Sequence, residues 1–353
     1  MSKNIKKTIG NIIFFILLIG ITFFLVFKDE DFSNILNIIG SVKIEYMLIA
    51  IGAMFGYYLL EAFNIWRILK TFGEKVNIFK ALKYTFVGSF FSSITPAASG
   101  GQPMEIYHMY KDGISRSYGI TALLIQLCCY QIVTIGYGIV AAIINWHMID
   151  NRLIFLVILG LCINSIGLTI MLICLFSKTL TRKLINILIK LMKLVKYKKA
   201  EKKIEELEAG LEKYNNGSDF IKKHKSIFIK SIIVVFFQMT LYYIVPFLIY
   251  KAFGLNEYNV FKLITIQAVL YSSVSGLPFP GAVGISEGVF MNIYSSIYGS
   301  EILSSAMLLN RGVNFYLFVF ISAIVTMINT FMFKDKKDEE SEKDIKQLDE
   351  PKY

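Results

Sequence analysis

The chain has 353 residues, of which 55% are hydrophobic, a mean hydropathy of +0.56 and a formal net charge of +11. This hydropathy excludes an ordinary soluble globular protein and indicates a polytopic membrane protein. The positive charge does not indicate a nucleic-acid partner, because Lys and Arg gather in the cytoplasmic loops of membrane proteins.

Six apolar runs are long enough to cross the hydrocarbon core of a bilayer, which takes about 20 residues. They are 9–27, 46–66, 118–146, 153–176, 228–250 and 304–333. The first run follows Lys3, Lys6 and Lys7, which place the N-terminus in the cytoplasm. Because it is longer than the apolar part of a signal peptide and no small-residue cleavage site follows, we interpret it as a retained span.

Residues 81–95, ALKYTFVGSFFSSIT, are apolar but short for a full span. If they crossed the membrane, the loop that carries Lys111 and Arg116 would lie outside and every later loop would be inverted. The 178–230 region, with 15 Lys and Arg against 6 acids, would then lie outside, contrary to the positive-inside rule. We therefore predict that 81–110 enters from the cytoplasm, turns at TPAASGGQP and returns as a re-entrant hairpin.

The segment 262–299 is predicted to form a second re-entrant hairpin, which opens to the outside. Its flank at 251–259 is expected outside, and the chain after the last span is expected inside. A single crossing at 304–333 satisfies both expectations only if 262–299 returns to the side from which it came.

The two hairpins are similar in sequence. FSSI at 91–94 matches YSSV at 271–274, and Pro, Gly and small residues follow in both. Glu105 and Glu287 come 13 and 15 positions after the first serine of each motif. Similar motifs in oppositely oriented units indicate an inverted-topology repeat, whose broken segments meet near the middle of the membrane. The predicted fold is therefore all-α, with about six full spans and two opposed re-entrant hairpins.

We predict one transmembrane domain over 1–335 and a disordered cytoplasmic tail over 336–353, which is low in apolar residues. A cytoplasmic loop at 178–227 interrupts the spans. It begins with a basic amphipathic helix at 180–199, which suits an anionic membrane surface. Its polar residues recur every three or four positions, at Lys183, Asn186, Lys190, Lys193 and Lys196.

The broken segments are the predicted binding site. An irregular backbone at membrane depth must be buried in protein or line a wet cavity. Accessible backbone amides at glycines, and the N-termini of short helices, suit anionic head groups. The alternative is that the glycines and serines only allow close packing of helices. The residues of this prediction are Ser92, Ser93, Gly100, Gly101, Gln102, Glu105, Ser272, Ser273, Gly281, Gly284, Glu287 and Arg311.

Charged residues inside the membrane are candidates for function, because they are costly to place there. Glu105 and Glu287 follow the two breaks. Arg311 lies inside the last span and needs an acidic partner or a phosphate, and Glu287 is the nearest acid by topology. On the second span, Glu61 is a weaker candidate and Arg67 is interpreted as an interfacial anchor.

Enzyme signatures are missing. The sequence has no P-loop, no HExxH and no paired Cys/His pattern for a metal. We therefore predict no catalytic residues, no cofactor and no metal site. His108, beside the first hairpin, is expected to be a solvated surface histidine.

Three motifs, TPAASGGQPMEIYHMYKDGISRS, PFPGAVGISEGVF and LLNRGVNFY, resemble the lysylphosphatidylglycerol synthetase transmembrane-domain family of flippase-like membrane proteins. The resemblance covers most of the chain, and the TPxxxGGQP turn is its more specific part. In the two-domain synthetases this region translocates aminoacylated phosphatidylglycerol, which a separate cytoplasmic domain makes from aminoacyl-tRNA. The resemblance also adds Pro103 and Pro280 to the candidate residues.

Only 20 residues follow 333, so we expect no aminoacyltransferase domain and no lysyltransferase activity. The lead hypothesis is a lipid translocase of a bacterial cytoplasmic membrane, with both termini in the cytoplasm. Its expected partner is a membrane phospholipid with an anionic or aminoacylated head group. The alternatives are a phosphatidylglycerol lysyltransferase-type enzyme and a non-catalytic partner that docks a separately encoded lipid synthase through 178–230.

Overall fold

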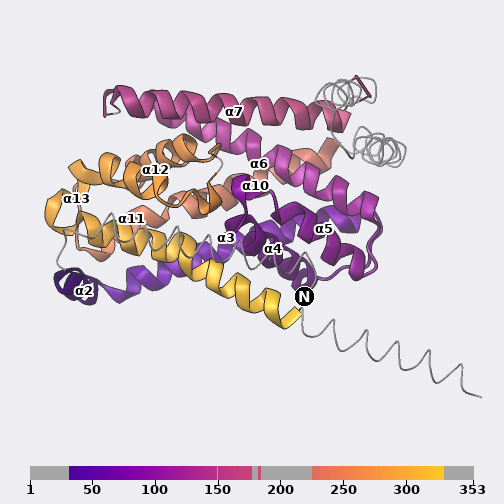
Figure 1. Cartoon of the computed structure of the whole chain (residues 1–353), viewed down its shortest axis with the longest axis horizontal. Coiled ribbons are helices and arrows are strands. Elements are labelled where there is room, and N and C mark those ends of the chain that lie inside the picture. The colour runs from indigo at the N-terminus through magenta and orange to yellow at the C-terminus, as the bar shows by residue number, and fades with distance from the viewer. Residues whose placement is uncertain (1–31, 149, 177–181, 184–224, 278, 330–353) are drawn as a thin grey trace, which may run out of the picture.

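The computed structural model describes residues 32–148, 150–176, 182–183, 225–277 and 279–329 (Figure 1). The predicted span at 9–27, nearly all of the loop at 178–227 and the tail at 336–353 lie outside the described residues. All regular elements in the described part of the chain are helices, so the predicted all-α class is confirmed.

The described residues form long helices that span the bundle and shorter helices between them. The helices are α2 (Phe32–Gly40), α3 (Ile44–Thr71), α4 (Ile78–Ser93), α5 (Gly101–Lys111), α6 (Arg116–Ile144), α7 (Asn151–Phe176), α10 (Lys225–Tyr243), α11 (Val245–Ala252), α12 (Val260–Val274) and α13 (Ile285–Arg311). The short helical turns are η1 (Pro96–Ala98), η2 (Trp146–Met148), η3 (Pro280–Ala282) and the π-helical η4 (Gly312–Tyr316).

Five stretches of the described residues are long and apolar enough to cross a membrane. They are Ile44–Thr71, Arg116–Ile144, Arg152–Ile173, Ser226–Ala252 and Pro280–Asn329. Each contains most of one of the five predicted spans that fall within the described residues, so these spans are confirmed. The predicted first span is not among the described residues.

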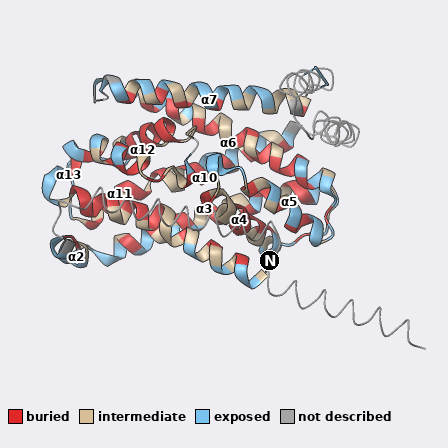
Figure 2. Ribbon diagram, viewed as in Figure 1, coloured by how far each residue is buried: buried red, intermediate tan, exposed pale blue. Residues whose placement is uncertain are grey.

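The outer surface of the bundle is apolar, as a bilayer requires. The long helices bury one side against their neighbours and expose the other (Figure 2). On α6 the side chain of Ile143 is 71% exposed, and on α7 that of Ile166 is 62% exposed. Hydrocarbon accepts such side chains without the cost that water would impose. The exposed faces therefore fit contact with lipid.

Helices α4 and α5 pack against each other as the first hairpin. The side-chain Oδ1 of Asn77 accepts the backbone N–H of Lys80 at 2.8 Å and caps the start of α4. After α5 ends, the backbone N–H of Ser115 donates to Glu74 Oε1, in the loop before α4, at 3.1 Å. The hairpin therefore starts and ends at the same end of the bundle.

An ion pair closes this end of the hairpin. Asp112, just after α5, accepts hydrogen bonds from Lys83 Nζ and Tyr84 Oη on α4, both at 2.6 Å. Burial alone would raise the pKa of Asp112, but these two hydrogen bonds and the positive charges of Lys83 and Lys80 together outweigh it and hold that pKa below its ordinary value. A carboxylate with a depressed pKa stabilises the folded state above its unfolded pKa. This stability is lost as the pH falls through the folded pKa.

We expect Asp112→Asn to lower the free energy of unfolding at pH 7 by about 1.5 kcal/mol, as for other hydrogen bonds to charged groups. The difference from wild type should shrink as the pH falls below about 4, because the wild-type carboxylate then protonates too. Unfolding of the purified protein in detergent at several pH values between 7 and 3 measures both effects. Glu45→Gln, on an exposed side chain, is the control. A difference that is constant over this range would contradict the assignment.

Small residues allow α4 and α5 to approach closely. A methyl group at Gly88 would overlap the carboxylate of Glu105, and one at Gly101 would overlap the Oγ of Ser92. Gly88 and Ser92 are four residues apart on α4, as Gly101 and Glu105 are on α5, so each pair shares one helix face. This close packing sets the side chain of Glu105 directly against α4.

Helix α12 and the first part of α13 form the second hairpin, which begins as the first one does. The Oδ1 of Asn259 accepts the backbone N–H of Lys262 at 2.9 Å. Lys262 Nζ then donates to Asn145 Oδ1, just after α6, at 2.8 Å. Helix α13 packs against α2, and its returning limb ends at Gly299, where a φ of 69° breaks the helix before the last span.

The two hairpins point toward each other from opposite ends of the bundle, and their tips are in contact (Figure 1). The tips share one backbone form. PAA at 96–98 and PGA at 280–282 each have φ between 50° and 58° at their second and third residues. With 16 and 15 residues, α4 and α12 span about 24 and 22 Å, less than the hydrocarbon core of about 30 Å. Their insertion into the bilayer as re-entrant hairpins stays a prediction.

Cysteine labelling tests this prediction in a version of the protein without its native cysteines. Single cysteines at Lys75 and Lys111 should react with an impermeant maleimide from the cytoplasmic side of sealed vesicles. A cysteine at Glu257 should react from the other side. The reason is that the loops before α4 and after α5 lie together and carry Lys and Arg. Labelling of positions 75 and 111 from opposite sides would contradict the hairpin.

Candidate functional site

The tips of the two hairpins and the spans around them line a cavity of about 640 Å³. This volume lies in the range of small-molecule binding sites. Its walls come from α3, α4, α5, α6, α7, α10, α12 and α13, together with η1, η3 and η4. Ala97 and Phe279 line the cavity and are exposed, so it reaches the surface at the hairpin tips.

Six of the predicted site residues line this cavity. They are Ser92, Ser93, Gln102, Glu105, Gly281 and Arg311. The structure brings them together from both hairpins and from the last span, although they are up to 219 positions apart in the sequence (311 − 92). The other predicted residues lie beside the lining rather than in it. These are Gly100, Gly101, Pro103, Ser272, Ser273, Pro280, Gly284 and Glu287.

The serine pair of the second hairpin is buried in helix contacts. Ser272 is 1% exposed and fits against Gly138 of α6 and Gly160 of α7, where a methyl group on either glycine would overlap it. The hydroxyl of Ser273 donates to the carbonyl of Leu270 at 2.7 Å. On this hairpin the cavity is lined instead by Ser275 and Ser286.

Arg311 and Glu287 form the predicted ion pair, which is confirmed. Arg311 Nε lies 2.8 Å from Glu287 Oε1, and both side chains are buried. The guanidinium also donates to the carbonyl of Gly281 at 3.1 Å and lies over the ring of Phe315. The hydroxyl of Tyr316 donates to the same carboxylate oxygen at 3.1 Å. This network ties the second hairpin to the last span at the π-helical turn, a deviation that is frequent at functional sites.

Glu105 and Glu287, which are equivalent in the sequence repeat, have different surroundings. Glu287 is the third residue of α13 and also accepts the backbone N–H of Gly284 at 2.7 Å. Glu105 is the fifth residue of α5 and is 7% exposed. Among the described residues, no donor and no cation contacts its carboxylate.

A chain of polar side chains crosses three spans to reach the cavity. Arg67 on α3 donates to Asn64 Oδ1 at 2.7 Å, and Asn64 donates to Gln126 on α6. Gln126 donates to Gln238 on α10 at 3.4 Å, and Gln238 donates to Glu61 Oε2 at 3.3 Å. Each group donates to the next, so the chain starts at a cation and ends at a carboxylate in the cavity wall. Arg67, expected as an interfacial anchor, is a partly buried member of this chain.

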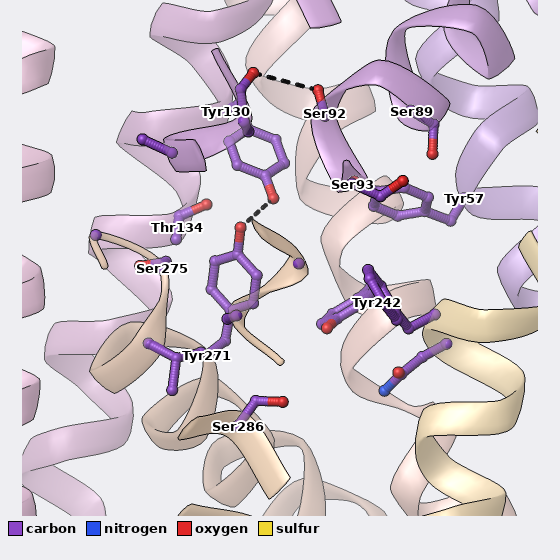
Figure 3. A pocket seen from close by; sticks show the side chains of 18 of the residues that line it. Tyr57, Ser89, Ser92, Ser93, Tyr130, Thr134, Tyr242, Tyr271, Ser275 and Ser286 are labelled. Carbon is purple, nitrogen blue, oxygen red and sulfur yellow. Dashed lines mark hydrogen bonds between the residues drawn. The ribbon is translucent and has the colours of Figure 1, made fainter. Parts of the chain in front are cut away.

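Five tyrosines line the cavity, and the sequence did not identify them as site residues. Tyr130 of α6 and Tyr271 of α12 point toward each other, with their hydroxyl oxygens 2.5 Å apart (Figure 3). The others are Tyr57, Tyr58 and Tyr242. Their rings form an amphipathic wall that offers both π faces and hydroxyl groups.

Several other polar side chains of the cavity have buried oxygens that receive no hydrogen bond from the part of the chain that the structure describes. They are Gln131 Oε1, Thr134 Oγ1, Asn310 Oδ1 and Asn314 Oδ1. In the sequence, the signal for such residues is an isolated polar side chain inside an apolar run. Amide and carboxylate oxygens accept hydrogen bonds, so the cavity is rich in acceptors.

Residues 11–322 match the sequence model of the family described as the lysylphosphatidylglycerol synthase TM region. The chain belongs to this family. It is also 21% identical over 328 residues to a "UPF0104 membrane protein" from Archaeoglobus fulgidus, covering 88% of this chain and 94% of that relative. Family membership and the five apolar helices together make the chain a multi-pass membrane protein of the lysylphosphatidylglycerol synthase type.

In this member of the lysylphosphatidylglycerol synthase TM family, the charges of the cavity do not balance. Arg311 is compensated by Glu287, whereas Glu61 and Glu105 have no cation beside them among the described residues. The site can therefore offer carboxylates, acceptor oxygens and aromatic rings to a ligand. His108 is not part of the lining, and the expectation that it is solvated is wrong, because it is 4% exposed. It is buried because it lies on the inner side of the short helix α5, between Glu105 and Met109, which are also buried.

Proposed function

We propose that the protein translocates a phospholipid, of the phosphatidylglycerol or aminoacylated phosphatidylglycerol type, across the cytoplasmic membrane. The observation that carries this proposal is a polar cavity in an otherwise apolar bundle, at the place where the two hairpin tips meet. A lipid head group is costly to move through hydrocarbon, because its polar groups lose their hydrogen bonds there. A polar cavity at that depth replaces those bonds.

The opposed hairpins supply a route for alternating access. Each hairpin is short, begins at its own end of the bundle and reaches only to the cavity. A small displacement of either one would open the cavity toward that hairpin's own end of the bundle, while the other hairpin keeps the second side closed. The long spans stay in place, and the acyl chains of the lipid remain in the bilayer.

The lining favours a head group that carries hydrogen-bond donors or a positive charge. Within the described residues, Glu61 and Glu105 are carboxylates with no cation beside them, and Asn310 and Asn314 add acceptor oxygens without a hydrogen-bond partner. Tyrosine rings attract cations through their π faces. The phosphate of the lipid would meet the N–H groups of Arg311 that remain after its Nε donates to Glu287 and its Nη2 donates to the carbonyl of Gly281.

Flux through the cavity can be tested by filling it. Purified protein is reconstituted in liposomes with a labelled phosphatidylglycerol, and the movement of the label between leaflets is followed. We expect Gln131→Trp to reduce this movement at least about tenfold, because the indole would fill the lining and a tenfold loss needs only about 1.4 kcal/mol on the barrier.

The control is Ile139→Trp on the same helix, α6, where the side chain is 47% exposed on the outer surface. This variant should move lipid at the wild-type rate. Unfolding curves of both variants establish that they are folded. Equal rates for the two folded variants, or no lipid movement by the wild type, would overturn the proposed function.

A further inference from the structure

Two carboxylates in the cavity wall, Glu61 and Glu105, are unlike all other acids of the described spans. Both are enclosed in the bundle, and neither has a cationic partner among the described residues. The nearby guanidinium of Arg311 is held by Glu287 at 2.8 Å. The guanidinium of Arg67 is linked to Glu61 only through the side-chain amides of Asn64, Gln126 and Gln238, each hydrogen-bonded to the next. Two ionised carboxylates in such a place would be costly.

The surroundings of the two groups differ in a way that assigns their protonation. Glu61 accepts a hydrogen bond from Gln238, the last donor of the chain that begins at Arg67. A donated hydrogen bond favours an ionised carboxylate. Glu105 is 7% exposed, receives no hydrogen bond from the described residues, and packs against the backbone of Gly88. Such a place favours the neutral acid.

We propose that Glu105 and Glu61 form a proton-binding site, in which Glu105 holds the proton while the first hairpin is closed and exchanges it with water when that hairpin opens. Because Glu105 is a residue of α5, opening the hairpin moves it away from Gly88 of α4. Lipid movement is then coupled to the proton gradient, and this second step rests on the proposed function.

The other titratable groups around Glu105 leave this assignment in place. From α3, Tyr57 and Tyr58 line the cavity beside Glu61, and from α6 Tyr130 does so. These phenols can donate a hydrogen bond but carry no charge near neutral pH. From α13 the charged side chain among the described lining residues is Arg311, which is paired with Glu287 of the same helix.

The elements packed directly on Glu105 add no free charge. On α4 the side chain of Glu105 lies against Gly88, and Ser92, one turn further on, lies against Gly101 of α5. Lys83 and Tyr84 of the same helix are bound to Asp112 at the far end of the hairpin. Two basic side chains follow Glu105 on α5: His108, which is 4% exposed and comes three residues later, and Lys111, at the same far end as Lys83.

Infrared spectroscopy of the purified full-length protein tests the proton site without any lipid transport. At neutral pH we expect a protonated-carboxyl C=O band that shifts in D₂O and is lost in Glu105→Gln. The control Glu257→Gln, on an exposed loop residue, should keep the band. A wild-type spectrum without the band, or a band that survives in Glu105→Gln, would overturn the proton site.

Coupling is tested with the wild type in liposomes that carry a pH gradient. For one proton per lipid, a gradient of one pH unit should drive the labelled lipid to an asymmetry of up to about tenfold between leaflets, because one pH unit is worth a factor of ten. A protonophore should abolish it. Lipid that moves but stays equally distributed would overturn the coupling. If no lipid moves, the proposed function fails, and the infrared result still decides the proton site.

Discussion

Replacing Arg311 by methionine is expected to lower the free energy of unfolding by about 3–5 kcal/mol, the usual cost of breaking a buried ion pair from one side. The substitution keeps most of the side-chain volume but leaves Glu287, which is 1% exposed, without its cation. It also removes the hydrogen bond to the carbonyl of Gly281 at the tip of the second hairpin. We therefore expect this hairpin to loosen from the last span.

The measurement is equilibrium unfolding of the purified protein in detergent, with Arg116→Met as the control. Arg116 is exposed and lies over the ring of Tyr110, so its loss should cost only about 0.5 kcal/mol. The double variant with Glu287→Gln should be more stable than Arg311→Met alone, because it removes the uncompensated charge. An Arg311→Met protein within about 1 kcal/mol of wild type would show that the pair does not hold the hairpin.

Replacing Gly160 by alanine should also destabilise the protein, by about 3 kcal/mol, the upper end for overpacking a core. A methyl group there would overlap the backbone carbonyl oxygen of Ser272. A backbone atom cannot rotate away as a side chain can, so α7 and α12 would have to separate. Their contact forms one wall of the cavity.

Gly167→Ala on the same helix is the matched control. No atom lies within 4 Å of the position its methyl group would take, and alanine favours a helix over glycine by about 1 kcal/mol. This variant should therefore be as stable as wild type or more so. Unfolding in detergent compares the two. Equal stability of the Gly160 and Gly167 variants would contradict the close approach of α7 and α12.

The return of the first hairpin could be predicted from loop charges, because Lys and Arg distribution depends on the membrane side rather than on side-chain packing. The hydrogen bond between Ser115 and Glu74 places its two ends together, as that prediction requires. The matching serine motifs were a weaker guide. Ser92 lines the cavity, whereas Ser272 packs against Gly138 and Gly160.

The tyrosines and the amide chain could not be predicted as parts of the site. Tyr130 and Gln126 lie on a long apolar span, and the direction in which each points is set by how α6 packs against α3, α10 and α12. Apolar runs do not encode this rotation, because every side of such a helix is compatible with lipid. The two glutamates after the breaks show the same limit. Glu105 and Glu287 lie 13 and 15 residues after the first serine of their motifs, and of these two glutamates Glu287 is the one that pairs with an arginine.

The sequence by itself determined that the protein is all-α, where its spans lie, and which two segments break. Those properties follow from local hydropathy, from Pro and Gly, and from loop charge. The tertiary structure alone decided which polar groups converge. Topology already made Glu287 the expected partner of Arg311. A buried charge is settled by its partners in space, so only the packed bundle shows that Glu105 has no cation beside it among the described residues.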